Sequence, residues 1–167
     1  MRILAIDPGN EQSAYVLLKD GYLVEFGKLD NEQLLGQLPS LVGYFDSAAI
    51  EMVACYGMPV GKEVFDTALW VGRYKQKLTD LGRQVDLVFR KDVKMHLCCT
   101  LKGVNDATIR QALIDRYGPG KDKAIGTKKA PGPLYGVSKD VWAALAVGVT
   151  WLDQVKTPQT RTTANSL

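Results

Sequence analysis

The sequence has very few residues that bind soft metals or form disulfides. It contains one histidine, His96, and three cysteines, Cys55, Cys98 and Cys99, with no CxxC spacing. This inventory argues against a zinc site. The odd number of cysteines favours a reducing, intracellular compartment over a disulfide framework.

Long apolar runs are also missing. No run reaches the ~18 residues of a membrane-spanning helix, and the N-terminus lacks the charged-then-apolar layout of a signal peptide. We therefore expect a cytoplasmic protein with no membrane partner.

The excess of charge is small. The net charge is +3 over 167 residues, with 46% hydrophobic and 23% charged residues, which is a globular composition. A charge this small does not by itself indicate a polyanionic partner, so the positions of the lysines and arginines matter more. We expect one domain over residues 1–155 and a polar, disordered tail over 156–167.

An apolar strand opens the chain and ends in an acid. Residues 2–7 lead into Pro8-Gly9, and the two-residue period of a strand places Asp7 on one face with Ile3 and Ala5. An acid at the rim of a covered sheet can hold a metal ion. The alternative is a plain turn, because Asp, Pro and Gly are all turn formers.

The remaining elements alternate between strands and helices. Hydrophobic periodicity and turn residues predict strands at 13–18, 22–26, 48–54 and 85–89, and helices at 31–45, 62–81, 91–99, 106–117 and 138–151. Asp20-Gly21 is a hairpin signal, so the first three strands are antiparallel. The order of elements predicts a mixed α/β domain.

Two further acids stand out. Glu51 lies within an apolar strand, where a carboxylate must be paired, hydrogen-bonded or bound to a cation; a solvent-facing edge position or a buried salt bridge is the alternative. Asp140 lies in the first turn of the last helix, where the helix dipole alone is a sufficient explanation. It shares a face with Ala143, Ala144 and Val147, and these small residues would let the helix lie close to the sheet.

Converging carboxylates repel one another unless a dication lies among them. Oxygen ligands without soft ones select Mg²⁺ or Mn²⁺. Two such ions can activate water and stabilise the leaving oxygen of a phosphodiester, which is nuclease chemistry.

These segments resemble the RuvC-type Holliday junction resolvases of the ribonuclease H-like superfamily, especially phage or prophage versions. The resemblance rests on residues 3–9, on Ile50-Glu51 with the following Gly/Pro loop and long helix, and on residues 140–146. It implies a ribonuclease H-like sheet of five strands, three antiparallel and then two parallel, flanked by helices.

The resemblance also implies a homodimeric, Mg²⁺-dependent endonuclease acting on branched DNA in recombination and repair. Asp7, Glu51 and Asp140 would be the catalytic metal ligands. Ala143 stands where the family usually has an acid, so Asp106 is either a fourth ligand or a simple helix cap. Ala54 stands where the family often has a Phe, and Tyr56 follows it, which leaves an aromatic wedge in doubt.

Basic residues gather in the segments that we place near the last helix. Phosphate contact is expected from Lys94, which matches the family's Val-Lys position. Tyr56, Phe65 and Tyr74 could stack on bases. The alternative for the Gly/Lys-rich stretch 118–137 is a solvated loop. The complete set of expected DNA-binding residues is Tyr56, Lys91, Lys94, Lys102, Lys121, Lys123, Lys128 and Lys129.

The helix at 62–81 has a wide apolar stripe. Such a stripe is more often core than interface, and packing is the expected role of Phe65, although the family dimerises through this helix. Three other functions compete: an actin-like ATPase lobe, a junction-binding protein that has lost catalysis, and a ribonuclease H-like nuclease with another substrate. The chain supplies only one of the two lobes that such an ATPase needs, so no nucleotide cofactor is expected.

Overall fold

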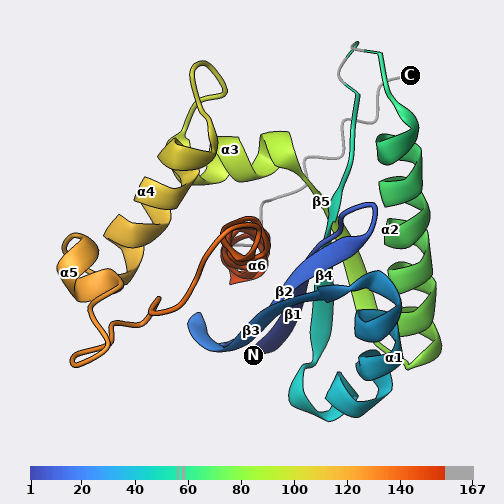
Figure 1. Ribbon diagram of the computed structural model, residues 1–167, viewed down its shortest axis with the longest axis horizontal. Helices are drawn as coiled ribbons and strands as arrows, with labels where there is room; N and C mark the ends of the chain where they lie inside the picture. Colours follow the sequence, from blue (N-terminus) through green and yellow to red (C-terminus); the bar gives the residue numbers. More distant parts are fainter. Residues whose placement is uncertain (56, 58, 157–167) are drawn as a thin grey trace, which may run out of the picture.

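A five-stranded sheet forms the centre of the structure, a computed structural model that describes residues 1–55, 57 and 59–156 (Figure 1). Its strands are β1 (Arg2–Asp7), β2 (Gln12–Lys19), β3 (Tyr22–Asp30), β4 (Ser47–Met52) and β5 (Gln84–Phe89). They lie in the order β3-β2-β1-β4-β5, and β1, β2 and β3 are antiparallel. Strands β4 and β5 continue the sheet in parallel with β1. The predicted mixed sheet is confirmed.

Helices cover both faces of this sheet. In Figure 1, α1 and α2 lie on one face and α3, α4, α5 and α6 lie on the opposite face, where α6 lies nearest to the strands. The first face carries α1 (Asn31–Leu41), extended by a 3₁₀ turn (Val42–Tyr44), and α2 (Lys62–Asp80). The second carries α3 (Arg90–Cys98), α4 (Asp106–Tyr117), α5 (Lys121–Ala124) and α6 (Val141–Lys156).

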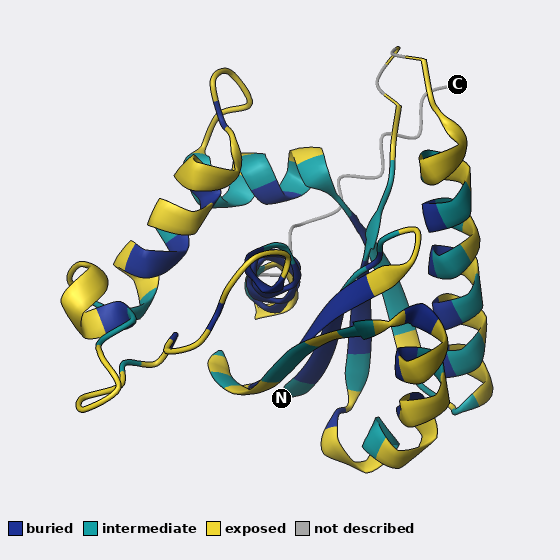
Figure 2. Cartoon of the chain, viewed as in Figure 1, coloured by how far each residue is buried: buried dark blue, intermediate teal, exposed yellow. Residues whose placement is uncertain are grey.

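The alternation of β1 divides the core into two layers. Ile3 and Ala5 pack in the layer with α6, and Leu4 and Ile6 pack in the layer with α1 and α2. All four side chains are fully buried, and Figure 2 shows β1 buried over most of its length. Because both faces are covered, the acid at the end of β1 lies at the rim of a closed core.

Helix α6 lies unusually close to the sheet at Gly148. A Cβ atom at this position would lie 2.8 Å from Leu18 Cδ1 and 3.0 Å from Ala5 Cβ. Only glycine avoids this contact, so the predicted close approach of the last helix is confirmed, with Gly148 as the residue of closest contact.

The stretch 118–137 is more structured than its composition predicted. It contains the short helix α5, and Ala124, Leu134 and Val137 are buried in the layer around α6. Three small or medium apolar side chains are enough to fix a segment whose glycines and lysines suggested a solvated loop. Its lysines remain exposed.

One helix start differs from the sequence prediction, and a second, that of α4, agrees with the predicted range and decides between Asn105 and Asp106 as its cap. Helix α6 begins at Val141 rather than directly after Ser138, because Lys139 adopts a left-handed backbone with φ +50°. At α4 the cap is Asn105, whose side chain accepts a hydrogen bond from Thr108 N. Asp106 is therefore not the cap of that helix.

The outer face of α2 also differs from expectation. Thr67, Val71, Tyr74 and Leu78 face the core, whereas Phe65 and Leu69 are 64% and 63% exposed. The expectation that Phe65 packs within the domain was wrong, because the apolar stripe is wider than the surface that the sheet covers.

No helix within the described ranges is both long and apolar enough to cross a bilayer. The polar tail was expected over residues 156–167. Its first residue, Lys156, is the last residue of α6, and residues 157–167 lie outside the described part of the chain, as does Tyr56.

Candidate active site

Asp7 and Glu51 meet at the ends of neighbouring strands. The parallel register pairs Ile6 of β1 with Ile50 of β4, so the next residue of each strand is an acid. The two carboxyl groups lie close enough together for Glu51 to raise the pKa of Asp7. Glu51 is only 13% exposed. The structure thus brings together two of the three predicted acids.

The pKa values of this pair are raised. Burial is the largest cause, followed by the charge of Glu51, and together with the charge of Asp140 they raise the pKa of Asp7 to about 8. Burial also raises the pKa of Glu51, although the positive charge of Arg90 opposes this rise. At neutral pH the pair therefore retains a proton.

Two cations lie among the acids. Arg90, the first residue of α3, has its guanidinium 3.7 Å from Glu51 Oε1 and also pairs with Asp106. Lys28 of β3 pairs with Asp140 at 2.5 Å. Sequence reasoning missed both residues. Arg90 directly follows a predicted strand and could have been noticed there, but the position of Lys28 depends on how β3 crosses the sheet.

Asp140 lies nearby without completing a compact cluster. Its charge raises the pKa of Asp7, but its side chain is half exposed and paired with Lys28. Within residues 1–55, 57 and 59–156, no three acidic, histidine or cysteine side chains are grouped closely enough to hold a metal ion. Asp106 is 90% exposed and turned towards Arg90.

The donor set at the strand ends fits a hard dication. Asp7 and Glu51 offer carboxylate oxygens, the ligands that Mg²⁺ and Mn²⁺ prefer. A dication would also replace the proton that the buried pair now retains, because it relieves the same repulsion. Asp140 could join them only by leaving Lys28.

A buried polar network holds the turn that follows Asp7. Asn31 Nδ2 donates to the carbonyl of Gly9 at 2.9 Å, and the Ser13 hydroxyl donates to Asn31 Oδ1 at 2.6 Å. The hydroxyl of Tyr74 on α2 lies 3.1 Å from both Ser13 Oγ and Asn31 Oδ1. Sequence reasoning missed this network, since its members are far apart along the chain.

The expected DNA-binding lysines fall into two groups. Lys91 and Lys94 line a shallow groove together with Leu101 and Arg90. Arg90 is also the residue that pairs with Glu51. The others are exposed and farther along the chain; Figure 1 places α5 at the far end of α4 from Asp106. The second group consists of Lys102, Lys121, Lys123, Lys128 and Lys129.

Comparison with known proteins identifies the fold. No protein-family model matches the sequence, and no curated protein is similar to it. Two solved structures are similar over almost the whole chain. Thermus thermophilus RuvC shares 15% identity with a TM-score of 0.66, covering 93% of this chain and 96% of the other. T. thermophilus RuvC in complex with a Holliday junction substrate shares 16% identity with a TM-score of 0.63, covering 93% and 95%. The chain therefore has the RuvC-like form of the ribonuclease H-like fold.

Proposed function

We propose that this protein is a divalent-metal-dependent endonuclease that cuts branched DNA, with four-way junctions as its substrate. The observation that carries the proposal is the buried pair of carboxyl groups, Asp7 and Glu51, at adjacent strand ends. Such a pair is costly to bury in a protein that has no use for it. The RuvC-like fold supports a nucleic-acid substrate, and so do Lys91 and Lys94, which lie in a groove with the residue that pairs with Glu51.

The residues around the pair have distinct roles in this proposal. Asp7 and Glu51 would hold the dication, which when bound supplies charge for water activation and for the leaving oxygen. Arg90 would offset the negative charges of Glu51 and Asp106, with which it pairs. Asp140, released from Lys28, would be the third ligand, and Lys28 would then be free to contact a DNA phosphate.

The direct test uses the purified full chain with a synthetic four-way junction, a linear duplex and an RNA–DNA hybrid, each with Mg²⁺, Mn²⁺ or EDTA. We expect paired, symmetric nicks in the junction only, and none in EDTA. Cleavage of the hybrid alone would point to a ribonuclease H-like enzyme with another substrate. ATP turnover would contradict the proposal in favour of an ATPase.

A catalytically impaired junction-binding protein is a second candidate. The observation that favours it is the pairing of Asp140 with Lys28, together with Ala143 in place of the acid expected there. Tight junction binding without cleavage in any of the metals would support it.

The exposed lysines of the 118–137 segment provide a separate prediction. Replacing Lys121, Lys123, Lys128 and Lys129 with alanine should weaken junction binding and lower the slope of log Kd against log salt by about 0.9 for each phosphate that is no longer neutralised. Titrations at several salt concentrations measure the slope. The control replaces four lysines elsewhere: Lys19, Lys75, Lys77 and Lys156. Equal effects of both variants would contradict DNA binding by this segment.

The outer face of α2 is the proposed dimer contact. Phe65 and Leu69 lie one helical turn apart and are largely exposed, and a paired enzyme suits a junction with two-fold symmetry. We expect the double variant Phe65→Asp/Leu69→Asp to be a folded monomer where the parent chain is a dimer. Light scattering after size exclusion gives the mass, and circular dichroism checks the fold. A parent chain that is monomeric at tens of micromolar would contradict this assignment.

A further inference from the structure

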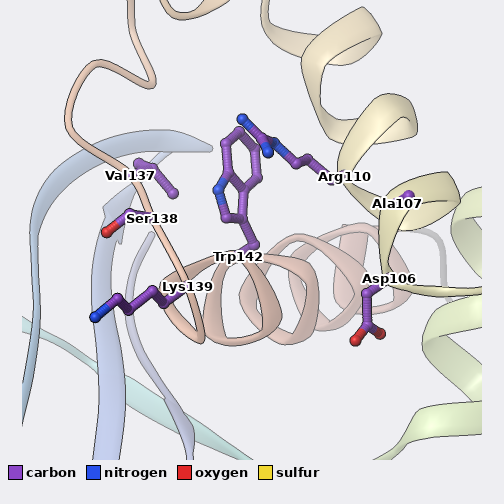
Figure 3. Close-up of a pocket in the computed structure, with 7 residues that line it drawn as sticks. All are labelled: Asp106, Ala107, Arg110, Val137, Ser138, Lys139 and Trp142. Atoms are coloured by element: carbon purple, nitrogen blue, oxygen red, sulfur yellow. The ribbon is translucent and has the colours of Figure 1, made fainter.

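A hollow of about 400 Å³ lies between the start of α4 and the start of α6 (Figure 3). Asp106, Ala107 and Arg110 of α4 form one wall, and Val137, Ser138 and Lys139 form the other. Trp142, in the first turn of α6, projects between them. Neither Arg110 nor Trp142 has a role in the proposed metal site.

The guanidinium of Arg110 packs against the indole of Trp142. Its guanidinium carbon is 4.8 Å from the ring centroid, and Figure 3 shows the guanidinium lying against the ring. Trp142 is only 8% exposed and so forms a fixed platform, whereas Arg110 is exposed. No hydrogen bond or ion pair joins Arg110 to any residue in the described part of the chain. Its N–H donors are thus held in place and available.

The hollow continues as far as Asp140. A second, smaller hollow of about 80 Å³ is lined by Arg90, Asp140 and Ala143. It shares Asp106, Lys139 and Trp142 with the first. A strand of DNA that passes Asp140 on its way to Asp7 and Glu51 would therefore lie close to the first hollow.

We propose that Arg110, held on Trp142, binds a backbone phosphate of the DNA strand being cut, next to the phosphate at the acids. The inference rests on the proposed function, because it assumes that a strand lies at Asp7 and Glu51. A guanidinium presents paired N–H groups that match two phosphate oxygens. Stacking on the indole fixes its plane before binding, so less side-chain freedom is lost on binding.

The other lining residues agree with this ligand. Lys139 adds a second positive charge, and Ser138 adds a hydroxyl donor. Asp106 is the one acid that lines the hollow, and its carboxylate is already paired with Arg90. The charged residues that line this hollow therefore leave a net positive charge, whereas those that line the smaller hollow balance one another. This suits a phosphate at Arg110, with the dication serving the phosphate at the acids.

The test is a double-mutant cycle between protein and DNA. Asp7→Asn, which prevents cutting, serves as the parent, and Arg110→Ala and Arg110→Lys are added to it. Four-way junctions carry a single uncharged methylphosphonate linkage, moved one position at a time around the cleavage site. We expect one position near the site where neutralisation weakens binding by the Asp7→Asn parent about tenfold. The variant that also carries Arg110→Ala should bind the unmodified junction about tenfold more weakly than the parent does. Neutralising that one linkage should not weaken its binding further.

Controls separate this interaction from charge in general. Lys19→Ala removes one positive charge at the opposite end of the sheet from Asp7 and should keep the sensitivity at that position. Arg110→Lys should recover only part of the affinity, because a lysine offers no planar pair of donors. An Arg110→Ala protein that is as sensitive as the parent at every position overturns the inference.

The outcomes also separate this inference from the proposed function. If the wild-type protein cuts junctions but the cycle shows no coupling at Arg110, the inference is wrong and the proposed function stands. If the wild-type protein cuts nothing, yet coupling at one linkage is found, the phosphate site is supported and the nuclease proposal fails. If the protein binds no DNA, both are wrong.

Discussion

We expect Asp7→Asn to lose junction cleavage by at least roughly 10³-fold while keeping its affinity for the junction. Asp7 is the member of the buried pair whose pKa is raised to about 8. Catalytic groups that act together lose most of their effect on the rate when one of them is removed. Single-turnover cleavage and binding isotherms measure the two quantities. Asp80→Asn, at the exposed end of α2, is the matched control and should cut normally. Cleavage by Asp7→Asn near the wild-type rate would contradict the assignment.

The same substitution should stabilise the protein without metal at alkaline pH. The pKa of Asp7 is raised from 3.8 to about 8, so between these values the folded state holds a proton that the unfolded state has released. The stability from this group is complete below about pH 4 and is lost as pH rises towards 8, by at most about 1.4 kcal/mol per unit. Asparagine cannot ionise, and its amide can donate to Glu51 in place of the lost proton.

Thermal unfolding in EDTA between pH 5 and 9 measures this effect. We expect Asp7→Asn to have a flatter profile and a Tm at pH 8 that is higher than wild type by about 2–4 °C for each 1 kcal/mol gained. Mg²⁺ should raise the wild-type Tm more at pH 8 than at pH 6, because the dication binds the ionised pair. A less stable Asp7→Asn protein at pH 8 would show that the carboxyl pair is not strained.

Gly148→Val should destabilise the core. The new Cβ would lie 2.8 Å from Leu18 Cδ1 and 3.0 Å from Ala5 Cβ, so α6 must move away from the sheet. Overpacking of this kind costs about 1–3 kcal/mol. Since Asp140 immediately precedes α6, we also expect cleavage by the folded fraction to fall.

Urea denaturation gives the stability, and cleavage at low temperature gives the activity of the folded protein. Gly36→Ala is the control, because nothing lies within 4 Å of a Cβ at that exposed position of α1. It should be more stable than wild type by about 0.5–1 kcal/mol. A Gly148→Val protein with an unchanged urea midpoint would mean that α6 is less tightly fixed than its packing indicates.

Local patterns predicted the sheet and the first two acids. The alternation of Ile3, Leu4, Ala5 and Ile6 specifies a strand covered on both sides, and a charged residue at the same end of two such strands is visible without a structure. Glu51 stood out because an acid in an apolar run needs a partner. The structure supplies that partner as Asp7, one strand away.

Properties that depend on tertiary placement could not be predicted. Lys28 lies far from Asp140 in sequence, and only the path of β3 brings their side chains together. Periodicity showed that α2 is apolar on a wide stripe, but not that the sheet covers only part of it and leaves Phe65 exposed. Composition also misjudged the stretch 118–137, because burial of Ala124 and Leu134 outweighs its glycines and lysines.

The hydroxyl of Tyr74 connects the two sides of the molecule. It belongs to the inward face of α2, whose outward face carries Phe65, and it contacts the residues that fix the turn after Asp7. A shift of α2 by a single ångström would stretch these hydrogen bonds beyond their useful range. The proposed assembly through that helix would therefore be thermodynamically linked to the geometry of the carboxyl pair, so that a second subunit could tune the proposed cleavage without contacting the DNA.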